Sequence, residues 1–253
     1  MTLVVNGRFL PQVPGGLQRT ARSLLEALRP LVDLEVVAPA PDPMADVVLK
    51  GPGGRGGGQL WEQVLLPRHA AGRPVLSLAN TAPLASRRST VWVHDLAPLV
   101  GPQWFRPSMR LYGQLVLRAA RRAELVVTVS EAVRGELLSR GVRRVEVVRP
   151  AVDPLVTPHP GPAPTDGPYV LMVGWADPRK DLATALAAHL RVTAPHRLVL
   201  VGARRGVFAP IAAPHGESVT VLPHVSDDEL RALMTGASAL LFPSLYEGFG
   251  LPP

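Results

Sequence analysis

The sequence predicts an α/β protein of two domains, each built on a parallel β-sheet, with the second domain incomplete. Short apolar segments of strand length alternate along the chain with segments of helical periodicity, which is typical of βα units. A proline-rich stretch, His159–Pro168, interrupts this alternation, and a new apolar segment follows it directly. Hydrophobic residues make up 47% of the 253 residues, which is enough for a buried core. We therefore expect one domain over residues 1–165 and another over residues 166–253.

The first domain contains most of the expected strands. Each candidate is a short run of apolar and β-branched residues between turn residues. The candidates are Leu3–Val5, Leu34–Val37, Asp46–Leu49, Val75–Leu78, Thr90–Val93, Leu125–Thr128 and Val145–Val148. Helices are expected between them over Leu17–Leu28, where leucine and alanine recur on one face, over Gln59–His69 and over Arg106–Arg122.

The second domain has fewer expected strands. They are Tyr169–Val173, Arg197–Val201, Val219–Leu222 and Ala239–Phe242. The sequence from Ser226 to Glu229 has the spacing of a capping box, which predicts a helix that begins there and ends near Gly236. A doubly wound sheet usually has more than four strands, and for this reason we expect the second domain to be incomplete.

Composition limits the classes of function. The chain has no cysteine, which excludes disulfide frameworks, cysteine-ligated metal sites and a thiol nucleophile. The first residues do not resemble a signal peptide, and no apolar run approaches the roughly 18 residues of a membrane span. We therefore expect a cytoplasmic protein that is soluble or peripheral to the membrane.

The positive charge is concentrated in the first half of the chain. Residues up to Thr165 include 20 basic and 12 acidic side chains, whereas the remaining residues include 7 and 8. Lys50 and Lys180 are the only lysines, so arginine-rich codon usage explains the excess as well as an anionic partner does. We expect no nucleic-acid partner.

Several familiar motifs are missing or incomplete. Gly51–Gly56 has the spacing of a dinucleotide-binding loop, but Pro52 interrupts it and no acidic residue lies between Glu62 and Asp95 to bind a ribose. No glycine loop continues into Lys-Ser or Lys-Thr, as a P-loop would, and no two aspartates stand two residues apart, as in a metal-binding Asp-x-Asp motif. The His-x-x-x-His motif of zinc peptidases and the Gly-x-Ser-x-Gly motif of serine hydrolases are also missing. The sequence therefore indicates no P-loop, no zinc peptidase, no serine hydrolase, no metal site and no cofactor.

Two segments of the first domain place polar groups after strands, where ligands of α/β proteins bind. Gly15 and Gly16 open the helix after the first strand, and a helix start offers N–H groups and a positive dipole end to a phosphate. His94 and Asp95 directly follow Thr90–Val93. An ordinary tight turn explains the glycines, and a histidine satisfied within its loop explains His94, so neither segment decides the function alone.

Two segments of the second domain are more informative. Arg179 and Lys180 follow a strand and precede an apolar helical segment. Two cations at the positive end of a helix repel it unless an anion joins them, which favours phosphate binding over a solvated pair. Glu247 is a single carboxylate after a strand, and the Gly248–Gly250 turn beside it lets backbone N–H groups approach a ligand. A solvated loop glutamate is the alternative.

Taken together, these segments resemble glycosyltransferase family 4, whose members are retaining enzymes of the GT-B fold with two Rossmann-like domains; the pattern is mannosyltransferase-like. The segments with the resemblance are Asn6–Leu10, Gly16–Arg19, Trp61–Gln63, Ala79–Leu84, His94–Leu96, Val129–Glu131, Pro178–Lys180 and Ser244–Pro252. The first and last are the most specific. The resemblance implies that the N-terminal domain binds the acceptor and the C-terminal domain binds the nucleotide sugar.

The resemblance also implies roles for single residues, three of them catalytic: His94, Lys180 and Glu247. Arg179 and Lys180 would neutralise the donor diphosphate, which Gly16 would meet from the other domain. His94 would lie near the transferred sugar, and Glu247 would bond its hydroxyls as the first glutamate of an E-x7-E motif. The other implied donor-binding residues are Asn80, Val225, Gly248, Phe249, Gly250 and Leu251. Fixed cations and helix starts would stabilise the leaving diphosphate without a metal.

The chain departs from the family pattern mainly at its end, because the second glutamate of the motif would fall beyond Pro253. This predicts a truncated gene product or a fragment. Smaller departures are Thr20, where the family often has an aromatic residue, and Pro150-Ala151, which replace the usual Asn-Gly.

The resulting prediction is a retaining enzyme that moves a sugar from a nucleotide diphosphate sugar to a glycan or lipid-linked acceptor in cell-surface polysaccharide synthesis. Relatives with this N-terminal pattern often use GDP-mannose. Two alternatives stay open. One is a non-catalytic relative that binds nucleotide weakly or acts as a partner subunit. The other is a nucleotide-sugar 2-epimerase, although Pro178–Lys180 and Tyr246–Pro252 point away from it.

Arg106–Arg122 is a basic amphipathic segment, which predicts peripheral contact with an anionic membrane at its inner face. A helix that packs on the core and exposes its arginines to solvent is the alternative.

Overall fold

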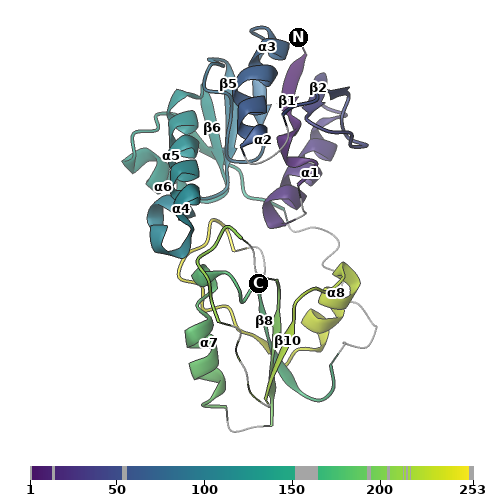
Figure 1. The fold of residues 1–253 in the computed structure, drawn as a ribbon, viewed down its shortest axis with the longest axis vertical. Coiled ribbons are helices and arrows are strands. Elements are labelled where there is room, and N and C mark those ends of the chain that lie inside the picture. Colours follow the sequence, from purple (N-terminus) through teal and green to yellow (C-terminus); the bar gives the residue numbers. More distant parts are fainter. Residues whose placement is uncertain are drawn as a thin grey trace. The chain divides into compact units, whose positions relative to one another are not determined.

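The computed structural model describes residues 2–12, 15–52, 56–151, 165–192, 195–203, 206–212, 214, 216 and 218–250. It divides into two compact units (Figure 1), one formed by Met1–Leu99 with Leu111–Pro150 and the other by Val100–Arg110 with Ala151–Pro253. Most of the proline-rich stretch lies outside the described residues, so the domain boundary at residue 165 stays a prediction.

The first unit is built on a seven-stranded parallel sheet in the order β3-β2-β1-β4-β5-β6-β7. Its strands are β1 (Leu3–Asn6), β2 (Leu34–Ala38), β3 (Val47–Val48), β4 (Val75–Ser77), β5 (Ser89–Val93), β6 (Leu125–Thr128) and β7 (Val145–Val147). Each overlaps a strand predicted from the sequence. The predicted α/β class with parallel sheets is therefore confirmed.

Both faces of this sheet are buried, which explains why its strands are nearly continuous apolar runs. Alternate residues of one strand belong to different clusters, with Val5 in the larger cluster and Val4 in the smaller one. Helices α1 (Gly16–Leu28), α5 (Pro107–Arg122) and α6 (Glu131–Ser139) pack into the larger cluster. Trp61 and α3 (Leu66–Ala70) pack into the smaller one.

The helix predicted over Gln59–His69 is present within a continuous helical run over residues 57–70, but this run contains a π-helical turn that was not expected. The structure has α2 (Gly57–Leu60), then a π-helical turn, η2 (Trp61–Leu65), and then α3. Pro67 has no N–H to continue the ordinary hydrogen-bond ladder, and Leu66 donates its N–H to the Trp61 carbonyl five residues earlier. The wide turn includes Glu62, which is fully buried.

The second unit has a smaller four-stranded parallel sheet in the order β10-β9-β8-β11. Its strands are β8 (Tyr169–Val173), β9 (Arg197–Val201), β10 (Val219–Leu222) and β11 (Ala239–Leu240). Helix α7 (Leu182–His189) packs on one face, and α8 (Asp227–Gly236) packs on the other. The capping box that begins α8 at Ser226 is confirmed.

Strand β11 is shorter than predicted. Only Ala239 and Leu240 pair with β8, and Leu241 adds one hydrogen bond to the Leu171 carbonyl, 2.8 Å long. Pro243 has no N–H to extend the ladder, so the chain leaves the sheet there as a loop.

In each sheet, successive strands are added outward in opposite directions from one pair of neighbouring strands. This pair, the switch point of the strand order, is β1 and β4 in the first unit and β8 and β11 in the second. Ligands of open α/β sheets bind in the crevice beside the carboxyl ends of the strands at such a switch point.

Among the described helices none combines the length and the apolar character that crossing a membrane requires.

Candidate functional site

At the switch point of the second sheet, Lys180 and Glu247 form an ion pair. The Lys180 Nζ atom donates to the Glu247 Oε1 atom across 2.6 Å. Lys180 follows β8 and Glu247 follows β11, so the two predicted residues meet although 67 positions separate them in the chain. Their side chains are 13% and 26% exposed, which leaves the pair accessible to a ligand.

The backbone after β8 fixes the position of Lys180. Gly174 has a φ of 79°, a left-handed conformation that glycine adopts without strain, and its N–H donates to the Val201 carbonyl. Asp177 caps the 3₁₀ turn η4 (Pro178–Lys180), and Asp181 caps α7 by accepting from the Thr184 N–H. The cations therefore lie in a turn that precedes the start of α7.

The Lys180 ammonium group also lies 4.2 Å from the centroid of the Phe242 ring, close enough for a cation–π contact. The Leu245 N–H donates to the Arg179 carbonyl across 2.8 Å, which ties the loop after β11 to the turn after β8. These contacts hold the two loops of the switch point together.

Arg179 is neutralised by a neighbouring carboxylate. Its Nη2 atom lies 2.6 Å from the Asp177 Oδ2 atom, and its Nε atom lies 3.1 Å from each oxygen of that carboxylate. The sequence argument that these cations need an external anion is therefore corrected: Asp177 and Glu247 offset the charges of Arg179 and Lys180 within the unit. An incoming phosphate would instead compete with these carboxylates.

The structure places the other predicted residues of the second unit as follows. Gly250 has a φ of 90°, and the Phe249 side chain is 39% exposed. Leu251 lies outside the described residues. Val225 follows β10 and packs on the core, and two strands separate β10 from β11, the strand that leads to Glu247 and Gly248. The predicted donor-binding role of these residues stays a prediction.

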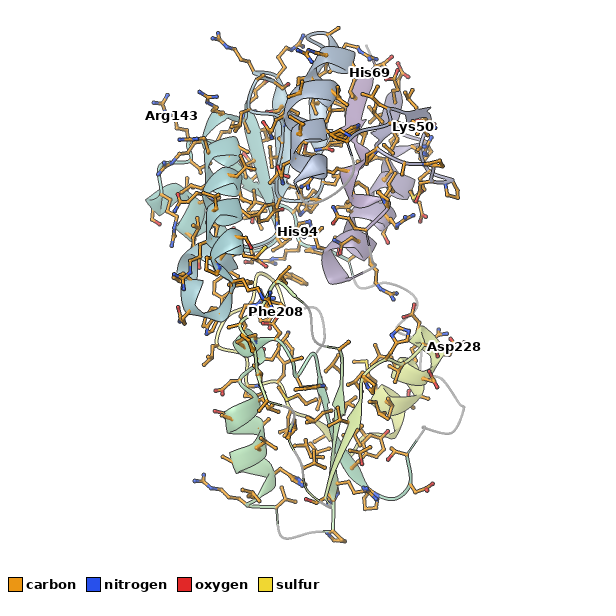
Figure 2. The ribbon with its side chains drawn as sticks, viewed as in Figure 1. Lys50, His69, His94, Arg143, Phe208 and Asp228 are labelled. Atoms are coloured by element: carbon orange, nitrogen blue, oxygen red, sulfur yellow. The ribbon has the colours of Figure 1, made fainter. Side chains whose placement is uncertain are left out.

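In the first unit, His94, which is labelled in Figure 2, is held by two hydrogen bonds. Its backbone N–H donates to the Asn80 Oδ1 atom across 2.7 Å, and its Nε2 atom lies 2.9 Å from the Leu78 carbonyl oxygen. Burial lowers the pKa of His94, so the ring is neutral at pH 7. A carbonyl only accepts, so the ring proton is on Nε2, and Nδ1 can accept a hydrogen bond from a hydroxyl.

Asn80 thus has a clear structural contact. It has a left-handed φ of 67°, and its side-chain oxygen fixes the backbone of His94. Gly16 is the first residue of α1, with Gly15 as an N-cap that supplies no side-chain hydrogen bond. The described residues of the two units contain no group of three histidine or acidic side chains placed to hold a metal ion.

Sequence reasoning missed a buried polar network at the switch point of the first sheet. The Glu62 carboxylate lies 3.0 Å from the Arg8 Nε atom, accepts from Asn6 Nδ2 at 2.7 Å and accepts from Thr81 Oγ1 at 2.9 Å. Arg8 also donates to Thr81 Oγ1 across 2.6 Å. Burial raises the pKa of Glu62, and the Arg8 charge opposes this shift. A charged residue within an apolar helical segment was the available signal.

Two family models match the chain. Residues 14–154 match glycosyltransferase family 4, and residues 158–253 match the glycosyl transferases group 1. The O-antigen chain mannosyltransferase RfbU of Salmonella typhimurium is 27% identical over 188 residues, which are 71% of this chain and 52% of that protein. The chain therefore spans about half the length of this curated relative.

Solved structures share the fold. A sucrose-phosphate synthase from Thermosynechococcus elongatus matches 99% of this chain and 77% of its own, with a TM-score of 0.66 and 19% identity. Anabaena HepE in complex with UDP and glucose matches 99% of this chain and 76% of its own, with a TM-score of 0.64 and 18% identity. The fold is therefore of the GT-B class, with one parallel sheet in each unit. Since the first family model covers more than half of the chain, this protein belongs to glycosyltransferase family 4.

Proposed function

We propose that this protein is a retaining transferase that moves a sugar from a nucleotide diphosphate sugar to a glycan or lipid-linked acceptor. The donor diphosphate would bind at the switch point of the second sheet. The observation that supports this most directly is the Lys180–Glu247 pair, which joins the loops after β8 and β11. Both partners remain partly exposed, so the pair can open to admit a ligand.

The chemistry follows from exchange of partners. When a diphosphate binds, the Lys180 ammonium group would turn from the Glu247 carboxylate to a phosphate oxygen. Glu247 would then be released to accept hydrogen bonds from sugar hydroxyls. As the bond to the sugar breaks, negative charge grows on the leaving diphosphate, and Lys180 and Arg179 stabilise that charge more than they stabilise the ground state. The sugar develops oxocarbenium character, and the acceptor hydroxyl oxygen attacks the anomeric carbon from the face that the diphosphate leaves. The proton of that hydroxyl would pass to the departing phosphate oxygen.

His94 and Gly16, which belong to the first unit, offer two groups that could bind a substrate at that unit. The unprotonated Nδ1 atom of His94 is an acceptor for a sugar hydroxyl. The start of α1 at Gly16 offers backbone N–H groups to a phosphate. Because the proposed site uses fixed cations, we expect activity to persist in EDTA. Complete loss that Mg²⁺ or Mn²⁺ restores would refute that part of the mechanism.

The relatives suggest two donors. RfbU is named a mannosyltransferase, which supports GDP-mannose, whereas HepE was solved with UDP and glucose, which supports UDP-glucose. Calorimetric titration of the chain with UDP, GDP and the two sugar nucleotides separates these donors. Transfer would be assayed with the donor that binds.

Lys180→Ala is the decisive variant, and Lys50→Ala is its matched control because Lys50 is the other lysine and is exposed. We expect Lys180→Ala to weaken nucleotide binding while Lys50→Ala retains it. If all four nucleotides fail to bind, or if Lys180→Ala binds as the wild type does, the proposed donor site is wrong. Binding without transfer would instead favour a non-catalytic relative.

We also propose that α5 contacts an anionic membrane surface from which a lipid-linked acceptor is reached. One face of α5 is buried through Gly113, Val116, Leu117, Ala119 and Ala120. The arginines of α5 are exposed, namely Arg110, Arg118, Arg121 and Arg122, and Arg106, which directly precedes α5, is exposed as well. Each basic side chain near an anionic surface contributes roughly 1 kcal/mol.

Co-sedimentation with vesicles tests this contact. The chain should bind vesicles that contain phosphatidylserine, should not bind vesicles of phosphatidylcholine alone, and should be released by high salt. Replacing Arg118, Arg121 and Arg122 together by glutamine should weaken binding, because these residues lie on the exposed face. Equal binding to both kinds of vesicle would exclude an electrostatic contact.

A further inference from the structure

The segment Val100–Arg110 belongs to the second unit, although residues on both sides of it in sequence belong to the first. Three contacts fix it there. Phe105 forms an antiparallel bridge with Phe208, the Arg106 N–H donates to the Val207 carbonyl at 3.1 Å, and the Ala209 N–H donates to the Trp104 carbonyl at 2.9 Å. We call Trp104–Arg106 the strap.

The strap brings an aromatic ring to Arg179. The Arg179 guanidinium carbon lies 5.7 Å from the centroid of the Phe105 ring and 5.8 Å from that of Phe208. The two rings are 5.4 Å apart, and Phe105 is only 5% exposed. Figure 2 shows Phe208 beside the turn that precedes α7, where Arg179 lies.

A second ring of the strap contacts the other loop of the switch point. Trp104 lies 6.4 Å from Tyr246, measured between ring centroids, and Tyr246 directly precedes Glu247. The strap therefore touches both loops that supply the proposed donor-binding residues. Neither contact depends on the Lys180–Glu247 pair itself.

The rings of Phe105 and Phe208 and the carboxylate of Asp177 all contact the Arg179 guanidinium group and so restrict its orientation. A free arginine side chain loses much rotational freedom when it binds a phosphate, and an arginine held in advance loses less. A ring close to a guanidinium group attracts it, and the attraction is stronger where the two groups are desolvated. Removing the ring would therefore weaken phosphate binding without removing the charge.

We propose that the strap is a positioning element of the donor site, in which Phe105 holds Arg179 in the orientation that binds the donor diphosphate. Phe105 would be a positioning residue and would not touch the substrate. This inference rests on the proposed function, because it requires that Arg179 bind a phosphate.

A double-mutant cycle with UDP as the ligand tests the inference. Phe105→Leu keeps an apolar side chain but removes the ring, and we expect it to raise the Kd for UDP roughly fivefold to tenfold. In an Arg179→Gln background the same change should have no further effect, since the group that it positions is gone. Phe105→Tyr keeps the ring and should retain wild-type affinity. Leu111→Ala, at a position 76% exposed on α5, is the control.

The outcomes separate the inference from the proposed function. If the wild type binds UDP but Phe105→Leu leaves the Kd unchanged, or weakens binding equally in both backgrounds, the strap does not position Arg179. If the wild type binds neither UDP nor GDP, the proposed function fails and the inference fails with it. Should Phe105→Leu not fold, as judged by thermal unfolding, Phe208→Leu replaces it in the cycle, because Phe208 reaches the same guanidinium group and is less buried.

Discussion

The two switch points occupy the same topological position but differ in chemistry. In the first sheet, Glu62 is completely buried and three side chains satisfy its carboxylate. In the second sheet, the Lys180–Glu247 pair is 13% and 26% exposed and rests against one ring. The two basic side chains are about equally exposed, with Arg8 at 14% and Lys180 at 13%, so the difference lies in the carboxylates. The Glu62 carboxylate is closed to solvent, whereas the Glu247 carboxylate is accessible and can exchange its partner. A shared fold therefore does not assign the same role to equivalent positions.

Burial is the physical reason for this difference. A carboxylate that loses all its water must be compensated by fixed protein partners, and losing one partner leaves an unpaired charge. A partly exposed pair can separate, because water replaces the lost contact at small cost. We therefore interpret the Glu62 network as part of the scaffold and the Lys180–Glu247 pair as part of the binding site.

The largest expected effect comes from breaking the closed network. Glu62→Gln removes the buried charge that pairs with the largely covered Arg8 guanidinium group, which is 14% exposed, so we expect the free energy of unfolding to fall by about 3–5 kcal/mol. Glu247→Gln, at the partly exposed pair, should change the free energy of unfolding by less than about 1 kcal/mol. Urea denaturation of the two variants at pH 7 measures both values.

A control distinguishes the lost charge pair from a general packing defect. Replacing Arg8 by methionine and Glu62 by leucine together removes both charges and should recover much of the stability that Glu62→Gln loses. Equal destabilisation by Glu62→Gln and Glu247→Gln would contradict the distinction between a closed and an open switch point.

The next effect is on turnover. Lys180→Ala removes a charge that the leaving diphosphate requires, so we expect transfer to slow by on the order of 100-fold, about 3 kcal/mol in the transition state. The unfolding free energy should change little, since the pair is partly exposed. Steady-state kinetics with the donor identified by titration would measure this loss, with Lys50→Ala as the control. Turnover close to that of the wild type would remove Lys180 from the mechanism.

The sequence predicts the strands well, because parallel strands buried on both faces are apolar runs that stand out from their surroundings. Every described strand overlaps a predicted one, and the Ser226 capping box marks the start of α8 correctly. The π-helical turn at Trp61 was not predicted, since helical periodicity does not distinguish it from an α-helix. It depends on a hydrogen bond that Leu66 makes around Pro67.

Contacts between distant segments were harder to predict. The sequence indicates that Lys180 and Glu247 each follow a strand, but only the strand order, with β8 beside β11, brings them together. In the same way, nothing local to Phe105 indicates that it packs on Arg179. A single sequence shows residue types and their spacing along the chain. The Lys180–Glu247 and Phe105–Arg179 contacts depend instead on which strands and segments lie side by side in the fold.

The smallest predicted effect tests whether burial, rather than the number of partners, makes the Glu62 network costly to break. Glu35 also has two charged or polar partners, since it lies 3.2 Å from Arg73 and 2.5 Å from His69, but its side chain is 25% exposed. The hydrogen bond from Arg73 is the main cause that lowers the pKa of Glu35 below 4.5. A lowered pKa stabilises the folded state above pH 4.5, and that contribution disappears as the pH falls through the folded-state pKa.

We therefore expect Glu35→Gln to reduce the free energy of unfolding by less than about 1 kcal/mol at pH 7. The difference from the wild type should vanish in acid, where the wild-type carboxylate is itself protonated. Urea denaturation at pH 7 and at successively lower pH measures both features. If Glu35→Gln instead costs as much as Glu62→Gln at pH 7, then the number of partners sets the energy of these networks. In that case the partial exposure of the Lys180–Glu247 pair would no longer be a reason to assign it to the binding site while the Glu62 network is assigned to the scaffold.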